Sequence, residues 1–100
     1  MTFVQIVSFH CTDPSALRDI EDEWLAATEG RRTLQRETFL VDRNDPSHFM
    51  TINEFESYEA AMQNSELPET DAMARKVAGL LIGEPTYHDL DVVKVADFGS

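Results

Sequence analysis

Four segments of the chain show the spacing of apolar residues that is typical of β-strands. Residues 2–11 carry apolar side chains at odd and at even positions, as a central strand covered on both faces does. Residues 42–47 are dense in turn-forming residues and predict a hairpin loop. We expect strands over residues 2–11, 31–42, 48–56 and 86–95, followed by a loose tail over 96–100.

The first interval between strands shows helical spacing. Asp13 and Pro14 provide an N-cap and a first helical position, and Gly30 closes the helix as a left-handed cap. The apolar stripe of this helix consists of Leu17, Ile20, Trp24 and Ala27. We assign the charged residues to the solvent-facing side, namely Asp19, Glu21, Asp22, Glu23 and Glu29.

The second helical region is broken. Ser57 caps a short helix, Pro68 interrupts it, and a further helix is expected over residues 69–81. The order of elements is therefore strand, helix, strand, strand, broken helix, strand. Right-handed crossovers fold this order into an α+β, ferredoxin-like βαββαβ unit with an antiparallel four-stranded sheet (order 4-1-3-2) and the helices on one face. Residues 1–100 are expected to form this single domain.

The sheet face away from the helices carries apolar side chains that no predicted element covers. A second copy of the same sheet is the simplest cover, so we expect a homodimer in the form of a dimeric α/β barrel. A charged residue in place of Val7 or Ile52 should then disrupt folding or pairing.

Composition and charge exclude several classes of function. The net charge is −11, and the eight Lys and Arg residues form no run longer than Arg31-Arg32, which argues against nucleic acid binding. No stretch approaches the roughly 18 apolar residues of a membrane span. Residues 1–11 lack the features of a signal peptide, so we expect a soluble, cytoplasmic protein. Cys11 is the only cysteine, and we expect it to be a small buried packing group.

A more specific pattern begins at Asp45-Pro46 and continues as HFMTINEFESYEAAM. A short strand ends in Glu, and an aromatic residue, a Ser and a small helix with an Ala and a bulky apolar residue follow. With the length and the order of elements, this pattern resembles the antibiotic-biosynthesis-monooxygenase type of dimeric α/β barrel over nearly the whole chain. The residues that carry the resemblance, which mainly pack the helix onto the sheet, are Glu54, Phe55, Ser57, Ala61 and Met62.

Two positions depart from that family's pattern. Phe55 stands where the family frequently has Trp, and Asn64 or Ser65 stands where it frequently has His. Members that degrade haem ligate iron through a helix histidine, and neither half of the second helical region contains one. We therefore expect no cofactor. The wider superfamily includes cofactor-free oxygenases, isomerases, polyketide cyclases and stress proteins, so the resemblance implies no single chemistry.

The three histidines are the first candidates for chemistry. In the predicted topology His10 ends one strand, while His48 and His88 begin the strands on either side of it, so all three should lie at the same end of the sheet. Imidazole suits acid–base chemistry near neutral pH, which makes His10 and His88 candidate catalytic residues and His48 a candidate substrate-binding residue. Solvent-exposed rim histidines, an acid–base pair and a metal site remain as interpretations. We expect no metal, because convergent ligands are not evident.

Several other side chains are candidates for a substrate pocket. Trp24 is either core packing or the wall of a pocket between helix and sheet. Asn53 lies in mid-strand, where an amide needs a partner; it either orients a substrate oxygen, as a third candidate catalytic residue, or bonds to a neighbouring strand or a dimer mate. Gln5 admits the same two interpretations. Tyr58 and Tyr87 are candidate substrate-binding phenols or amphipathic packing residues.

Two hypotheses about function follow. The first is a small enzyme that acts without bound cofactor on an aromatic or polyketide-like metabolite, as a monooxygenase or as a cyclase or isomerase. The second is a non-catalytic homodimeric module that binds a small molecule or a protein partner. The sequence contains no dinucleotide-binding motif, P-loop or Gly-x-Ser-x-Gly elbow. A pocket lined by Trp24, Asn53 and a histidine would favour the enzyme.

Overall fold

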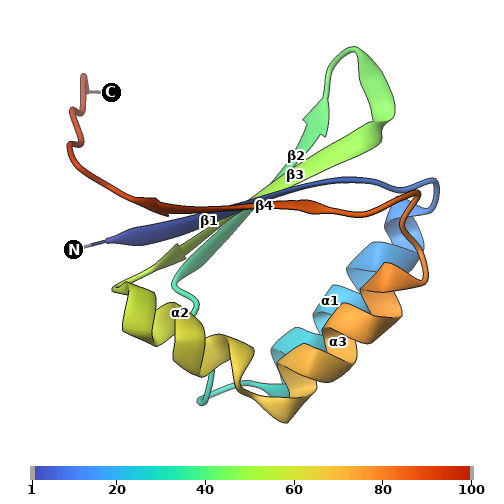
Figure 1. Cartoon of the computed structure of the whole chain (residues 1–100), viewed down its shortest axis with the longest axis horizontal. Helices are drawn as coiled ribbons and strands as arrows, with labels where there is room; N and C mark the ends of the chain where they lie inside the picture. Colours follow the sequence, from blue (N-terminus) through green and yellow to red (C-terminus); the bar gives the residue numbers. More distant parts are fainter. Residues whose placement is uncertain (1, 100) are drawn as a thin grey trace.

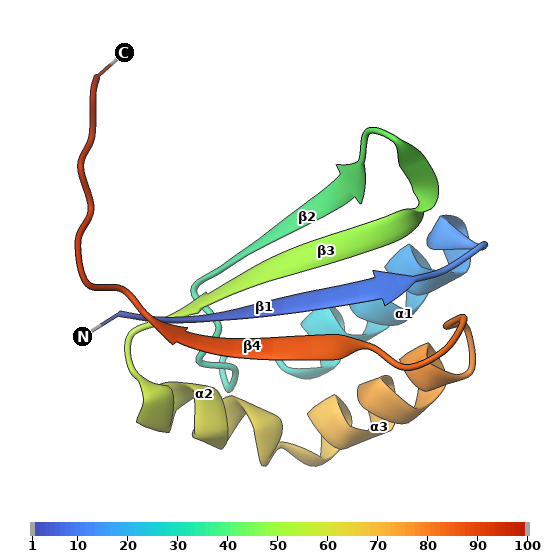
Figure 2. The same cartoon turned by 45° about the horizontal axis from the view of Figure 1, so that its top comes forward.

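The computed structural model describes residues 2–99 as a four-stranded antiparallel sheet with three helices on one of its faces (Figures 1 and 2). The strand order is β2-β3-β1-β4. The predicted α+β, ferredoxin-like fold and its order 4-1-3-2 are thereby confirmed. The elements are β1 (Phe3–His10), α1 (Pro14–Ala27), β2 (Arg36–Asp42), β3 (Asp45–Phe55), α2 (Tyr58–Ser65), α3 (Pro68–Ala78) and β4 (Thr86–Asp91).

Local hydrogen bonds explain where the helices begin. The Asp13 carboxylate accepts the N–H of Ala16 at 3.1 Å, and the Ser57 hydroxyl accepts the N–H of Ala60 at the same distance. Both predicted N-caps are therefore confirmed. Pro68 does not merely interrupt the second helical region: it is the first residue of α3, where its missing N–H leaves no intrahelical bond unmade.

Several strand boundaries differ from the prediction. The hairpin between β2 and β3 is a two-residue turn, because Asp42 pairs directly with Asp45 and its carboxylate accepts the N–H of Asn44 at 2.9 Å. Residues 31–35 precede β2 rather than belong to it, and the Arg31 guanidinium there pairs with Glu69 of α3. β4 ends at Asp91, earlier than expected, and residues 92–99 leave the sheet on the side away from the helices (Figure 1).

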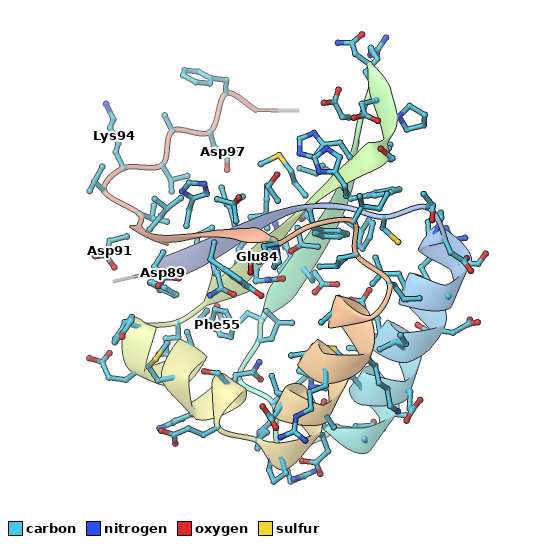
Figure 3. All side chains as sticks on the ribbon, turned by 45° about the vertical axis from the view of Figure 1, so that its right-hand side comes forward. Phe55, Glu84, Asp89, Asp91, Lys94 and Asp97 are labelled. Carbon is cyan, nitrogen blue, oxygen red and sulfur yellow. The ribbon has the colours of Figure 1, made fainter. Side chains whose placement is uncertain are left out.

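Two separate hydrophobic clusters fill the layer between sheet and helices. One lies beside α1 and α3 and is built on Phe9, Cys11, Leu17 and Phe49. The other lies under α2 and is built on Phe3, Phe55 and Ala61. Figure 3 shows Phe55 on the helix side of the sheet. The predicted role of Cys11 as a buried packing group is confirmed, since it is 1% exposed.

Among residues 2–99, no helix covers the other face of the sheet (Figure 2). Alternation along β1 and the register with its neighbours place Ile6 and Ile52 on this open face and Val7, which packs on the first cluster, on the helix face. A charge at Val7 would therefore act on folding, and a charge at Ile52 on the open face. None of the helices within residues 2–99 has the length and apolar character that a membrane crossing requires.

Candidate functional site

One row of side chains across the helix-facing side of the sheet is polar. The register pairs Glu37 of β2 with Asn53 of β3, Asn53 with Gln5 of β1, and Gln5 with Asp89 of β4. We call these four residues the polar row. It crosses all four strands between the two hydrophobic clusters, so it interrupts a face that is otherwise largely apolar.

A cavity lies over the polar row, between the sheet and helices α1 and α3. Its volume is about 340 Å³, and a smaller cavity of about 120 Å³ adjoins it on the side of α2. Both cavities are lined by Gln5, Glu37 and Asn53 from the polar row. The larger volume lies within the range of sites for small organic ligands, and apolar residues from both layers make up most of its wall.

Asn53 has an unsatisfied polar atom in this cavity. Among residues 2–99, its Oδ1 is the buried side-chain oxygen that lacks a hydrogen-bond partner. The neighbouring Gln5 amide is satisfied, because its Nε2 donates to Asp89 Oδ1 at 3.1 Å. A buried carbonyl without a donor costs about 1–3 kcal/mol, and a donor on a ligand would remove that cost.

Trp24 serves both of the functions that the sequence left open. Its side chain is buried, at 4% exposed, and its Nε1 donates to the Thr70 hydroxyl at 2.9 Å, which ties α1 to α3. The guanidinium of Arg32 lies 6.0 Å from the centre of its ring. The indole also forms part of the wall of the smaller cavity. Trp24 is therefore a core residue and a pocket wall together.

Glu21 also lines the larger cavity, although its charge predicts the solvent face of its helix. That assignment is wrong. Glu21 stands between the buried residues Leu17 and Trp24 at steps of four and three, which puts its carboxylate on the buried stripe. Burial raises the pKa of this carboxyl above its ordinary value, and the nearby charge of Asp22 raises that pKa further.

The two tyrosines are placed differently. Tyr87 of β4 lines the larger cavity and is 60% exposed, so the cavity reaches the surface beside it. Tyr58 of α2 lies outside the cavity lining and packs edge-on against Phe3, with ring centres 5.4 Å apart.

All three histidines lie on the open face, on the opposite side of the sheet from the cavity. The register pairs His10 with His48, and their rings stack with centres 4.7 Å apart. His88 pairs with Ile6, four residues back along β1 from His10. The expectation that all three gather at one end of the sheet is thus wrong for His88, because β4 starts opposite Ser8 and its register puts His88 opposite the middle of β1. None of the three lines the cavity described above.

His48 stands at the centre of a chain of hydrogen bonds. Its Nε2 lies 2.7 Å from the Ser8 hydroxyl, and its Nδ1 lies 2.9 Å from Asp42 Oδ2. The order Ser–His–Asp is that of a hydrolytic triad. Ser8, however, lies on a strand that is paired on both sides. The backbone N–H groups around it therefore bond within the sheet and do not form an oxyanion hole. Within residues 2–99, no group of three or more His, Cys, Asp or Glu residues is arranged to hold a metal ion.

The Asp42–His48 pair predicts an acid-sensitive contribution to stability. The hydrogen bond from His48 lowers the pKa of the Asp42 carboxyl below its ordinary value, and the N–H of Asn44 lowers it further. A carboxyl with a lowered folded-state pKa stabilises the fold above its unfolded-state pKa and loses that effect as the pH falls through the folded-state value. We expect Asp42→Asn to lower Tm at neutral pH, with the difference from wild type vanishing in strong acid. Thermal melts over pH measure this; a constant difference would contradict it.

The comparisons with known proteins concern the fold. No protein-family model matches the sequence, and no curated protein matches it significantly. Solved structures match over nearly the whole chain. They include a mutant form of SnoaB, a cofactor-independent oxygenase from Streptomyces nogalater (TM-score 0.80, 13% identity, 94% of this chain and 95% of that one). Another is an antibiotic biosynthesis monooxygenase (TM-score 0.73, 18% identity, 94% and 100%). A third is Rv0793 from Mycobacterium tuberculosis (TM-score 0.78, 16% identity, 97% and 100%). The fold is therefore that of the antibiotic-biosynthesis-monooxygenase type, as the resemblance implied.

Proposed function

We propose that the cavity binds a small, largely apolar metabolite of aromatic or polyketide-like structure, and that the protein acts on it as a cofactor-independent monooxygenase. The observation that carries this proposal is the unsatisfied Asn53 Oδ1 in a cavity of about 340 Å³ with a mostly apolar wall. Apolar walls bind a flat ring system, and one fixed polar atom orients it. SnoaB, a cofactor-independent oxygenase, has the same fold, which is an analogy of fold, while the cavity carries the proposal.

In such a reaction the deprotonated substrate supplies the electrons itself. A ring CH₂ group is converted to a carbonyl: one oxygen atom of O₂ ends on the carbon, and the other leaves as water with the two hydrogens. The protein needs to hold the substrate, exclude water and accept a proton. Asn53 would hold the substrate oxygen. A histidine was the expected proton acceptor, but in this monomer the acidic groups on the cavity wall are Glu21 and Glu37.

The placement of the histidines favours a second candidate function. Because no histidine lines the cavity, the cavity could serve as a binding site in a non-catalytic module. Oxygen consumption distinguishes the two. Native mass spectrometry of the protein from its source organism would identify a retained molecule, and that molecule would then be added to the protein under an oxygen electrode. Uptake above the protein-free rate supports the monooxygenase, while tight binding without uptake supports the binding module.

We also propose that the open face of the sheet pairs with a second copy of the chain. Its apolar side chains lie on all four strands and include two that are markedly exposed, Leu40 and Leu90. Residues 92–99 extend on the same side (Figures 1 and 3) and carry Val93, Val95 and Phe98, of which Phe98 is 95% exposed. Exposed apolar side chains that gather on one face are typical of an interaction surface, and a second sheet is the complementary cover.

Asn53→Leu tests the role of the cavity. The substitution removes the unsatisfied carbonyl, so we expect the free energy of unfolding to rise by about 1 kcal/mol. The same change removes the group that orients the ligand, so we expect affinity for the retained molecule to fall roughly tenfold or more. Chemical denaturation and calorimetric titration measure the two effects. Gln5→Leu is the control for the stability effect: the Gln5 Nε2 already donates to Asp89, so this change should not raise the free energy of unfolding. Unchanged affinity in Asn53→Leu would contradict the proposed orienting role.

A further inference from the structure

The polar groups that line the cavity include several hydrogen-bond acceptors without a partner. Three acceptor groups on the wall, Asn53 Oδ1 and the carboxylates of Glu21 and Glu37, have no hydrogen-bond or ion-pair partner within residues 2–99. Two of the donors beside them are already in use. The Gln5 amide donates to Asp89 at 3.1 Å, and the Ser65 hydroxyl donates to the carbonyl of Ala61 at 3.1 Å.

The charge of the cavity wall also favours a ligand that is not an anion. Among the described residues that line the larger cavity there are two carboxylates and no lysine, arginine or histidine. The two come from opposite layers, since Glu21 is on α1 and Glu37 is on β2. A ligand between the layers is therefore exposed to negative charge from both sides. Partial burial strengthens this repulsion for any anionic ligand, because less water screens it.

We infer that Glu21 makes the cavity selective for neutral or cationic ligands that carry a hydroxyl or amino donor, and that it excludes carboxylates and other anions of the same shape. The inference rests on the proposed function of the cavity as a ligand site, and it adds the chemical class of the ligand. Asn53 Oδ1 and the Glu21 carboxylate would accept hydrogen bonds from the ligand. An apolar residue at position 21 would complete the stripe from Leu17 to Trp24, so the carboxylate is a departure from what packing alone requires.

Three naphthalene probes of nearly equal shape test this selectivity by calorimetric titration at neutral pH. They are 2-naphthol, which is neutral with a donor, 2-methoxynaphthalene, which is neutral without one, and 2-naphthoate, which is anionic. For the wild type we expect 2-naphthol to bind best and 2-naphthoate to bind at least about tenfold more weakly. Glu21→Gln should reduce the difference between 2-naphthol and 2-naphthoate several-fold. Asp19→Asn is the matched control, because Asp19 is exposed on the same helix and is not among the groups that shift the pKa of Glu21, and it should leave the difference unchanged.

A pH series separates this role from a purely structural one. Burial, and then Asp22, hold the pKa of Glu21 above its ordinary value, so the carboxylate is neutralised before the pH falls to that ordinary value. We expect 2-naphthoate affinity to rise with acidification in the wild type and to rise less in Glu21→Gln. The other titratable groups on the same wall are Glu37 and Tyr87, and both variants retain them.

The outcomes are distinct. Binding of all three probes with equal affinity, or a preference for 2-naphthoate, would overturn the selectivity and leave the cavity as a ligand site. A naphthol preference that Glu21→Gln does not change would overturn the role of Glu21. If no probe binds, the proposed function of the cavity fails, and this inference fails with it.

Discussion

Replacing Ile52 by glutamate is expected to convert a dimer of twice the 11.3 kDa chain mass into a folded monomer. Ile52 lies on the open face of β3, where it pairs with Ile6 on one side and Thr38 on the other. In the proposed dimer this position is covered by the partner sheet, so two carboxylates would enter a largely apolar interface. Burying these carboxylates costs several kcal/mol of association free energy, which is sufficient to dissociate an assembly at micromolar concentration. Native mass spectrometry and sedimentation measure the mass.

Val7→Glu is the control for this substitution, since Val7 lies on the opposite face of the neighbouring strand. There a carboxylate would enter the cluster that contains Phe9 and Leu17 and would destabilise the domain itself. We therefore expect Ile52→Glu to retain the circular dichroism spectrum of the wild type and Val7→Glu to lose it. A wild-type protein that is monomeric at micromolar concentration would contradict the barrel, and a dimeric Ile52→Glu would place the interface elsewhere.

The parts of the fold that depend on neighbouring residues could be predicted from the sequence. Asp13 and Ser57 cap their helices by accepting an N–H three residues ahead, a distance that the sequence shows directly. The topology also follows from the order of the elements and the hand of their connections. The end of β4 was not predictable in this way. Val93 and Val95 continue a strand-like pattern, but β1, with which β4 pairs, begins at Phe3, opposite Asp91.

The candidate site depends on register, and for that reason only parts of it could be predicted. Asn53 and Gln5 each looked like an isolated polar residue in a strand. Only the pairing of Glu37, Asn53, Gln5 and Asp89 makes them one row. A shift by one residue would move every one of these side chains to the other face, and a sequence without pairing information does not determine that shift.

For Glu21 and for the histidines, the chemistry of the side chain does not reveal which face of the helix or sheet it occupies. Glu21 was assigned to the solvent face because it is charged, although its spacing from Leu17 and Trp24 places it on the buried stripe. The spacing in the helix predicts the face correctly, and it would have placed the Glu21 carboxylate among the residues that face the sheet. The histidines were chosen for their chemistry, and His10 and His48 do lie side by side. The sheet itself separates them from Asn53, so any proton transfer in the cavity must use groups on the helix side.

Trp24→Ala is expected to lower the free energy of unfolding by about 3–5 kcal/mol. The loss combines the buried ring, at 4% exposed, with the hydrogen bond to Thr70 that joins α1 to α3. For a domain of ordinary stability, about 5–15 kcal/mol, this removes roughly a fifth or more of the total. Trp24 is the only tryptophan, so denaturation of the variants is followed by circular dichroism.

Trp24→Phe and Thr70→Val separate the two contributions. Each should cost about 1 kcal/mol through the lost hydrogen bond, and the double variant should cost less than the sum, because one interaction is removed in both. Additive costs would show that the bond contributes nothing, and a cost below about 1 kcal/mol for Trp24→Ala would leave the indole as a pocket wall alone. Since the ring lines the smaller cavity rather than the larger one, Trp24→Phe should weaken most the ligands long enough to extend from Glu21 toward α2. A ligand that reaches the smaller cavity would contact Trp24, whereas a ligand confined to the larger cavity would not. The proposed role of the cavity therefore depends directly on Trp24 only for the longer ligands, and for these the same residue both contacts the ligand and holds α1 against α3.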